Sequence, residues 1–113
     1  MADREGPERE LTIRPRAIVD IEEHAEYLEE HAPPEVPVRF RAAIMDAFNY
    51  VAQMPGAGAR RKVRNSVLSN LRIWVVPGFN NYIVFYVMEG ETIDVIRVIH
   101  GAQDVEAALE DEE

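Results

Sequence analysis

Two side chains that could do chemistry lie near the end of a strongly apolar segment. Residues 82–101 read YIVFYVMEGETIDVIRVIHG, and the break Glu89-Gly90-Glu91 separates two runs rich in Val, Ile, Phe and Tyr. This pattern predicts an antiparallel β-hairpin. Strict alternation along its second strand puts Arg97 on the face of Ile93, Val95 and Ile99, and puts His100 on the other face with Ile96 and Val98. Arg97 could supply a cation to phosphate, and His100 could transfer a proton near neutral pH.

A second group of candidate residues is cationic. Its members share a stretch that contains no acid: Arg60, Arg61, Lys62, Arg64 and Arg72. The whole chain nevertheless has a formal charge of −9. Six acids crowd into one short stretch: Asp20, Glu22, Glu23, Glu26, Glu29 and Glu30. We therefore expect an electrostatically two-sided molecule, whose basic segment docks on an acidic partner or on nucleic acid.

Each candidate also has a structural interpretation. Arg97 fits a buried or rim ion pair with an acid of the helices or of the C-terminal segment, and such pairs are commoner than target contacts. His100 fits a hydrogen-bonding residue at a strand end, and the basic stretch fits a solvated loop. His24 and His31 have no third ligand nearby, so no metal site is expected, and no cofactor is implied. Cysteine is absent, which excludes disulfides and thiolate nucleophiles.

Two helices are expected to support these residues. After a short strand at Leu11–Arg14, Pro15 suits the first turn of a helix that ends near His31. The apolar stripe of that helix comprises Ile18, Ile21, Ala25 and Leu28. A second helix runs from Pro37 to about Met54. Its buried face comprises Phe40, Ile44, Ala47, Phe48 and Val51.

The remaining elements complete an α+β fold. Leu68–Val76 reads as the second strand, closed by Pro77-Gly78 and the turn-prone Asn80-Asn81, and the segment Asp104–Leu109 reads as a short final helix. The chain order is strand, helix, helix, strand, strand, strand and a final short helix. It predicts a small antiparallel sheet with an αα-hairpin packed on one face. The other face should be half open, with Trp74, Tyr82, Tyr86 or their neighbours forming an aromatic surface that implies a partner.

The 113 residues suit one domain, which we place at residues 11–109. Residues 1–10 form an acidic N-terminal extension that is expected to be disordered, and the acidic tail, residues 110–113, is expected to fray. No apolar run reaches the length of roughly 18 residues that a membrane helix needs, and the N-terminus lacks a signal-peptide core. A cytoplasmic protein without a membrane partner is the expectation.

The chain resembles the RelE/ParE toxins of type II toxin–antitoxin systems, and within them the ParE-like, plasmid-stabilisation branch. The resemblance spans roughly Ile13 to Asp104. The residues that carry it are Arg14-Pro15-Arg16-Ala17, Pro55 with Gly58, residues 82–86, and Arg97-Val98-Ile99-His100-Gly101 with Asp104. It implies a toxin held inactive by a small antitoxin whose C-terminal segment wraps around it. Target or antitoxin contacts then fall on Arg60, Arg61, Lys62, Arg64, Arg72, Trp74, Arg97 and His100.

The resemblance leaves two activities open. RelE-like toxins cut mRNA inside the ribosome, whereas ParE-like toxins inhibit DNA gyrase without cutting RNA. A metal-independent endoribonuclease needs two proton-transfer groups and fixed cations, for which this chain offers His100, Arg97 and Arg72. Ribonuclease members carry a tyrosine or basic residues after the last strand, where this chain has Gly101, Ala102 and Gln103, and the ParE-like pattern has arginine at the position of Gln103.

Gyrase inhibition is therefore the leading interpretation. On this interpretation the protein is more readily a binding inhibitor than an enzyme. The alternatives are the ribosome-dependent mRNA endonuclease and a degenerate, non-toxic binding module. The half-open sheet face fits a homodimer as well as an antitoxin interface, and the toxin–antitoxin heterotetramer remains a further arrangement.

Overall fold

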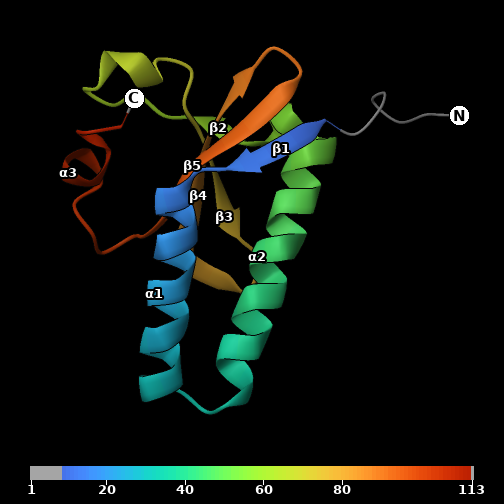
Figure 1. Cartoon of the computed structure of the whole chain (residues 1–113), viewed down its shortest axis with the longest axis vertical. Coiled ribbons are helices and arrows are strands. Elements are labelled where there is room, and N and C mark those ends of the chain that lie inside the picture. Colours follow the sequence, from blue (N-terminus) through green and yellow to red (C-terminus); the bar gives the residue numbers. More distant parts are fainter. Residues whose placement is uncertain (1–8, 113) are drawn as a thin grey trace, which may run out of the picture.

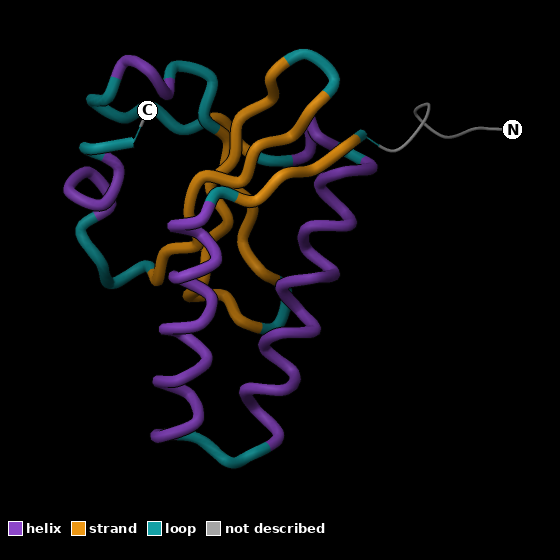
Figure 2. Tube along the Cα trace, in the orientation of Figure 1, coloured by secondary structure: helices purple, strands orange, loops and turns teal. Residues whose placement is uncertain are grey.

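One five-stranded sheet organises the protein, of which a computed structural model describes residues 9–112. The strands are β1 (Glu10–Ile13), β2 (Ala59–Arg60), β3 (Arg72–Val76), β4 (Phe79–Glu89) and β5 (Thr92–His100). Their order in the sheet is β1-β5-β4-β3-β2. The long helices α1 (Pro15–His31) and α2 (Glu35–Gln53) form a hairpin beside the sheet, and α3 (Val105–Leu109) follows the last strand (Figures 1 and 2). The predicted α+β class and chain order are confirmed.

The sheet is not wholly antiparallel. β1 pairs in parallel with β5, so that Leu11 lies opposite Ile93, whereas all the other strand pairs are antiparallel. A parallel pair needs a long crossover, and both helices and three strands lie between these two partners in the chain. The two-residue strand β2, which sequence reasoning missed, is too short to show a period.

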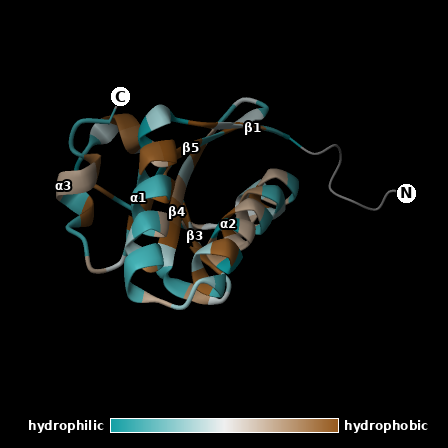
Figure 3. Ribbon diagram, turned by 60° about the horizontal axis from the view of Figure 1, so that its bottom comes forward, coloured by the Kyte–Doolittle hydropathy of each residue, from teal (hydrophilic) through white to brown (hydrophobic). Residues whose placement is uncertain are grey.

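Helix α1 begins where β1 ends, because Arg14 stays extended and Pro15 opens the helix. The Arg14 N–H donates to the Val95 carbonyl at 3.0 Å, which holds the start of the helix against β5. The predicted apolar stripe was wrong at Ile18, which is 49% exposed, whereas Ala17 is fully buried. Small residues at Ala17 and Ala25 allow the helix to approach the sheet closely. Figure 3 accordingly shows α1 as mostly hydrophilic ribbon interrupted by hydrophobic patches.

Helix α2 supplies most of the helical side of the core. The five residues of its predicted buried face are all buried. The helix begins at Glu35, two residues before the predicted start, because Pro37 is accommodated within the first turn. Neither long helix among the described residues has a stretch apolar enough to cross a membrane.

The second face of the sheet is closed rather than half open. A second apolar cluster fills it and consists of Leu68, Leu71, Phe85, Val87, Ile96, Ile99 and Leu109. The 3-10 turn η2 (Ser66–Leu68) and α3 cover this face with Leu68 and Leu109. The predicted aromatic surface was also wrong, because Tyr82 is 7% exposed and Tyr86 is 0% exposed, both beneath the helices.

A β-bulge determines which way the end of β5 faces. Phe85 lies opposite Arg97 while Tyr86 lies opposite Val95, so Ile96 has no partner on β4. Val95 and Val98 consequently both pack on the helical side, and Ile96 and Ile99 pack on the other. The predicted strict alternation was therefore wrong beyond Val95.

The boundaries of β3 and β4 differ from the prediction in two places. Leu68 belongs to η2, where the Asn65 side chain accepts a hydrogen bond from the Val67 N–H at 3.1 Å and stops the extended run. β3 therefore begins only at Arg72. The next turn uses Gly78, whose φ of 84° favours glycine, and the turn-prone residues Asn80 and Asn81 lie within β4 instead.

Both ends of the chain depart from the simplest expectation. Most of the predicted disordered extension, residues 1–8, lies outside the described residues, but the Arg9 N–H donates to the Ala52 carbonyl at 3.1 Å. The expected fraying of the tail is not seen at Glu112. Its carboxylate accepts from Arg14 at 3.2 Å and its carbonyl accepts from the Asn65 amide at 2.9 Å.

Tyr86 of β4 connects the turn after α2 to the sheet through two hydrogen bonds. Its hydroxyl donates to the Pro55 carbonyl at 2.7 Å and accepts from the Gly58 N–H at 3.0 Å. Burial raises the pKa of Tyr86, although the hydrogen bond from Gly58 and the charge of Arg72 act in the opposite direction. Because Tyr86 crowds the backbone here, a Cβ on Gly58 would collide with the Tyr86 hydroxyl and would lie 2.7 Å from the Ile73 carbonyl oxygen.

Replacing Gly58 by alanine should destabilise the fold. We expect Gly58→Ala to lower the free energy of unfolding by about 1–3 kcal/mol, because the added methyl forces Tyr86 or the backbone of β3 to shift. Gly56→Ala is the matched control, since a Cβ there meets nothing within 4 Å. Urea unfolding followed by circular dichroism measures both, and equal stability of the two variants would contradict the proposed crowding.

Candidate functional site

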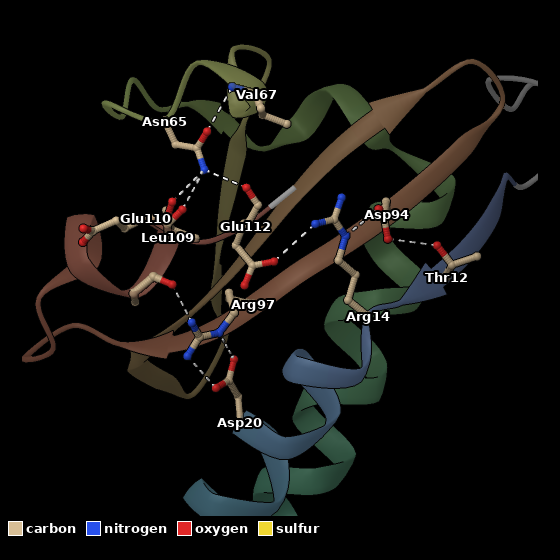
Figure 4. Close-up of polar contacts among 11 residues, drawn as sticks. Thr12, Arg14, Asp20, Asn65, Val67, Asp94, Arg97, Leu109, Glu110 and Glu112 are labelled. Carbon is tan, nitrogen blue, oxygen red and sulfur yellow. Dashed lines mark hydrogen bonds and ion pairs between the residues drawn. The ribbon is translucent and has the colours of Figure 1, made fainter.

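The most deeply buried charges form one ion pair between α1 and β5. The Asp20 side chain is 3% exposed and the Arg97 side chain 5% exposed, and the two are joined by hydrogen bonds of 2.7 Å and 2.8 Å (Figure 4). This two-pronged geometry suits a guanidinium and a carboxylate. The hydrogen bonds to Asp20 are the largest cause of the raised pKa of Arg97, with burial acting against them.

Asp20 also completes the edge of β5 that β1 leaves uncovered. β1 pairs with β5 only as far as Val95. Farther along, the Val98 N–H donates to Asp20 at 2.9 Å, and His24 lies 2.9 Å from the Val98 carbonyl oxygen. The His24 nitrogen is therefore the donor in this pair, because a carbonyl can only accept. Two side chains of α1 thus replace a missing neighbour strand.

Arg97 connects its ion pair with Asp20 to the C-terminal segment. Its third hydrogen bond runs to the Ala108 carbonyl of α3 at 2.7 Å. Asn65 donates to the Leu109 carbonyl at 2.8 Å, and Arg14 reaches Glu112 (Figure 4). The guanidinium is therefore committed to protein partners, which is the structural interpretation that the sequence allowed for Arg97.

The basic stretch lies on a loop between β2 and β3. Arg60, Lys62 and Arg64 are exposed, and Arg61 is half-buried. The Arg61 N–H donates to the Leu71 carbonyl at 3.0 Å, which extends the β2–β3 pairing by one bond. Arg64 has a weak ion pair with Glu106 of α3 at 3.9 Å. Most of the cationic surface here is therefore free to meet an acidic partner.

Arg72 stands beside this loop rather than beside Arg97. It lies directly opposite Arg60 across the β2–β3 pair, and its guanidinium donates to the Gly58 carbonyl at 2.6 Å. Like charges opposite each other in a sheet repel, so an anion bound between the loop and β3 would relieve the repulsion. The two arginines belong to one basic surface.

Trp74 borders an open groove between α2 and β3. Its ring stacks on Tyr50 of α2, with ring centroids 4.8 Å apart. Both rings line a groove of about 410 Å³ with Ala43, Asp46, Ala47 and Pro77. The Trp74 ring nitrogen has no hydrogen-bond partner among the described residues. The groove offers an apolar wall, while the unpartnered ring nitrogen of Trp74 is itself buried.

His100 lies in a different cleft, at the far end of β5. Its ring contacts Tyr82, with centroids 4.9 Å apart. The ring nitrogen Nδ1 accepts from the Ala102 N–H at 3.0 Å. The backbone N–H of His100 donates to the side-chain oxygen of Gln103 at 2.8 Å. The ring proton of the neutral imidazole therefore sits on Nε2. The Gln103 side chain thereby closes the turn after β5.

The cleft around His100 has a volume of about 360 Å³. It is lined by His24, Tyr27, Tyr82, His100, Ala102 and Gln103, and none of these is lysine or arginine. Burial, with a smaller contribution from the nearby Tyr27, raises the pKa of Tyr82, so its hydroxyl stays protonated at neutral pH. Within residues 9–112, no group of three His, Asp or Glu side chains is placed to hold a metal ion.

The candidate residues thus fall into three places. Arg60, Arg61, Lys62, Arg64, Arg72 and Trp74 share the surface around β2 and β3, Arg97 is buried, and His100 occupies the separate cleft. Arg72 lies opposite Tyr86 and His100 lies opposite Tyr82, which are four residues apart on β4, or roughly 13 Å along the strand. The three residues proposed for RNA cleavage are therefore not assembled into one site.

Comparison with known proteins agrees with this fold. The family model described as "ParE toxin of type II toxin-antitoxin system, parDE" matches residues 11–105, and the chain belongs to this family. A solved structure titled "Chromosomal ParDE TA system from P. aeruginosa" is similar in fold, with a TM-score of 0.68. The two chains share 15% sequence identity, over 82% of this chain and 96% of the other. No curated protein matches the sequence.

Removing one partner of the buried ion pair should be severely destabilising. Asp20→Ala is expected to lower the free energy of unfolding by about 3–5 kcal/mol, because it leaves the Arg97 charge buried without its partner. Glu22→Ala on the same helix is the control, since the Glu22–Arg41 pair is exposed and should contribute little. Chemical unfolding measures both, and a loss for Asp20→Ala no larger than that for Glu22→Ala would refute the assignment.

Proposed function

We propose that this protein inhibits DNA gyrase by binding it, and that a cognate antitoxin neutralises it by covering the basic surface around β2 and β3. The proposal takes its starting point from membership of the ParE toxin family. It places the protein in the cytoplasm, where a gyrase inhibitor must act. No cofactor takes part.

The observation that carries the non-enzymatic reading is the composition of the His100 cleft. Metal-independent RNA cleavage needs fixed cations for the negative charge that grows on phosphate. The lining of this cleft contains no lysine or arginine, and Arg97, three residues before His100 on β5, is held by Asp20. Helix α1, which forms one wall, carries five exposed acids besides the buried Asp20 and would repel an RNA backbone. Binding a protein target is the function that these residues fit better.

The antitoxin surface is argued from charge and shape. Exposed cations at Arg60, Lys62 and Arg64 stand out on a chain whose formal charge is −9. The groove beside Trp74 and Tyr50 adjoins the strand that bears Arg72. An acidic segment with an apolar side chain would satisfy both features, since opposite charge speeds encounter and apolar burial provides affinity.

Gyrase as the target is tested by expressing the protein alone in a bacterial host. We expect growth to stop while a DNA-damage reporter rises, because gyrase poisoning breaks DNA. Purified protein should inhibit supercoiling by gyrase at micromolar concentration. A flat reporter with arrested growth would reject the gyrase target and favour mRNA cleavage.

The same experiment with His100→Ala separates the alternatives further. A ribosome-dependent endonuclease using His100 would lose mRNA cleavage in this variant while still folding and binding its antitoxin. Normal growth on expression of the unmodified protein would instead indicate a degenerate, non-toxic binding module.

The antitoxin surface is tested by the double variant Arg60→Ser/Lys62→Ser. We expect its association rate with the antitoxin to fall roughly tenfold at low salt and to depend less on ionic strength, because long-range attraction has been removed. Arg39→Ser removes an exposed charge from the N-terminal part of α2, away from the basic surface, and should change neither the rate nor its salt dependence. Surface plasmon resonance at two salt concentrations measures the rates. Equal losses in both variants would show that only overall charge matters.

A further inference from the structure

We propose that the cleft formed by His24, Tyr27, Tyr82, His100, Ala102 and Gln103 seats an arginine side chain from a basic segment of a partner protein. This site is distinct from the basic surface assigned above to the antitoxin. The inference goes beyond the proposed function, because it rests on the cleft's own chemistry whichever protein supplies the arginine.

The first observation is the unused hydroxyl of Tyr82. The side chain is 7% exposed, and its ring contacts Phe40, His24 and His100 with centroid distances of 4.9, 5.0 and 4.9 Å. Its hydroxyl nevertheless makes no hydrogen bond with any residue among 9–112, although Tyr82 lines the cleft. Phenylalanine would make the same ring contacts, so packing alone does not require the hydroxyl, which is not among the buried polar atoms that lack a partner. Tyr86, four residues along the same strand, uses its hydroxyl twice.

The second observation is an aromatic face at the mouth of the cleft. Tyr27 is 56% exposed, and its ring is stacked on His31 with centroids 4.2 Å apart and an interplanar angle of 19°. The stack limits the freedom of the Tyr27 ring. A guanidinium is planar and binds to aromatic faces, while its edge N–H groups donate to oxygen. An arginine that lies on Tyr27 could therefore donate to the Tyr82 hydroxyl.

The third observation is the charge around the cleft. Glu23 and Glu30 are the i−4 and i+3 neighbours of Tyr27, so both carboxylates lie next to it on the surface of α1. Glu30 makes no ion pair with a described residue, and Glu23 has only a contact of 3.9 Å with Arg16. With no cation in the lining, the cleft favours a positive group and disfavours a phosphate.

Arginine fits the cleft better than lysine. In the turn after β5, the Ala102 N–H donates to His100 Nδ1, and the Gln103 side-chain oxygen accepts from the His100 backbone N–H. The groups that can still receive a cation are the Tyr27 ring, the Tyr82 hydroxyl and the flanking carboxylates, because the free groups of His100 and Gln103 are the donors Nε2–H and NH₂. A planar group with several donors can use all of these together, whereas an ammonium cannot stack.

The test is an NMR titration of the ¹⁵N-labelled protein with the blocked tripeptide acetyl-Gly-Arg-Gly-amide. We expect amide shifts at Tyr27, Ala102 and Gln103 with a dissociation constant of about 1 mM, as is usual for one side chain. The matched lysine tripeptide should bind several-fold more weakly, and the glutamate tripeptide should give no shift.

Tyr82→Phe should weaken the arginine tripeptide by about tenfold, the effect of losing one hydrogen bond to a charged group. Its unfolding midpoint should not fall, which separates binding from folding. Tyr50→Phe, on the Trp74 groove, is the control and should bind normally. Absence of shifts with the arginine tripeptide, or unchanged binding by Tyr82→Phe, would overturn the proposal. So would shifts at these amides caused by a single-stranded RNA tetranucleotide in place of the tripeptide.

Discussion

The buried pair of Asp20 and Arg97 is the interaction on which the remaining structure depends. It holds α1 against β5, satisfies the Val98 N–H that no strand reaches, and fixes the carbonyl end of α3. Removing two charges from water is costly, and the cost is recovered only when the hydrogen bonds are complete. Here four hydrogen bonds join one carboxylate, one guanidinium, the Val98 N–H and the Ala108 carbonyl, so the pair determines where three elements lie relative to each other.

This arrangement divides the surface into regions with different tasks. Arg97 is internal, whereas Arg60, Lys62 and Arg64 are exposed on β2 and on the loop before β3, at the edge of the sheet remote from α1. The acidic side of α1 lies beside the cleft of His100. A chain with a formal charge of −9 thus offers one basic and one acidic contact region. Two partners of opposite charge could bind such a molecule at the same time.

Sequence reasoning succeeded where a single period governs a segment. The buried face of α2 and the limits of α1 follow from helical spacing and from proline, and Asp104 caps α3 as its position before that helix suggests. It failed where tertiary contacts override the local pattern. The bulge at Ile96 reverses the alternation of β5, and nothing in the run of apolar residues there marks the extra residue.

The candidate site was likewise predictable only in part. The basic surface follows from composition, and the ion-pair interpretation of Arg97 was available because an arginine inside an apolar strand needs a partner. Which of the six acids would be that partner was not, because only the docking of α1 on β5 distinguishes Asp20. The hydroxyl of Tyr86 and the close approach of Gly58 were also hidden, since each depends on residues 28 positions apart.

The parallel pairing of β1 with β5 also affects how the protein is made. β5 lies inside the sheet, between β1 and β4, yet it is the last strand to be translated. Until β5 emerges from the ribosome, β1 has no partner strand and α1 lacks the strand on which it packs, although the helical hairpin can already form from local contacts. Long-range pairing of this kind is slow to form. A nascent chain therefore remains incompletely folded until almost its whole length has been synthesised, and during that interval its apolar surfaces are open to any protein that binds early.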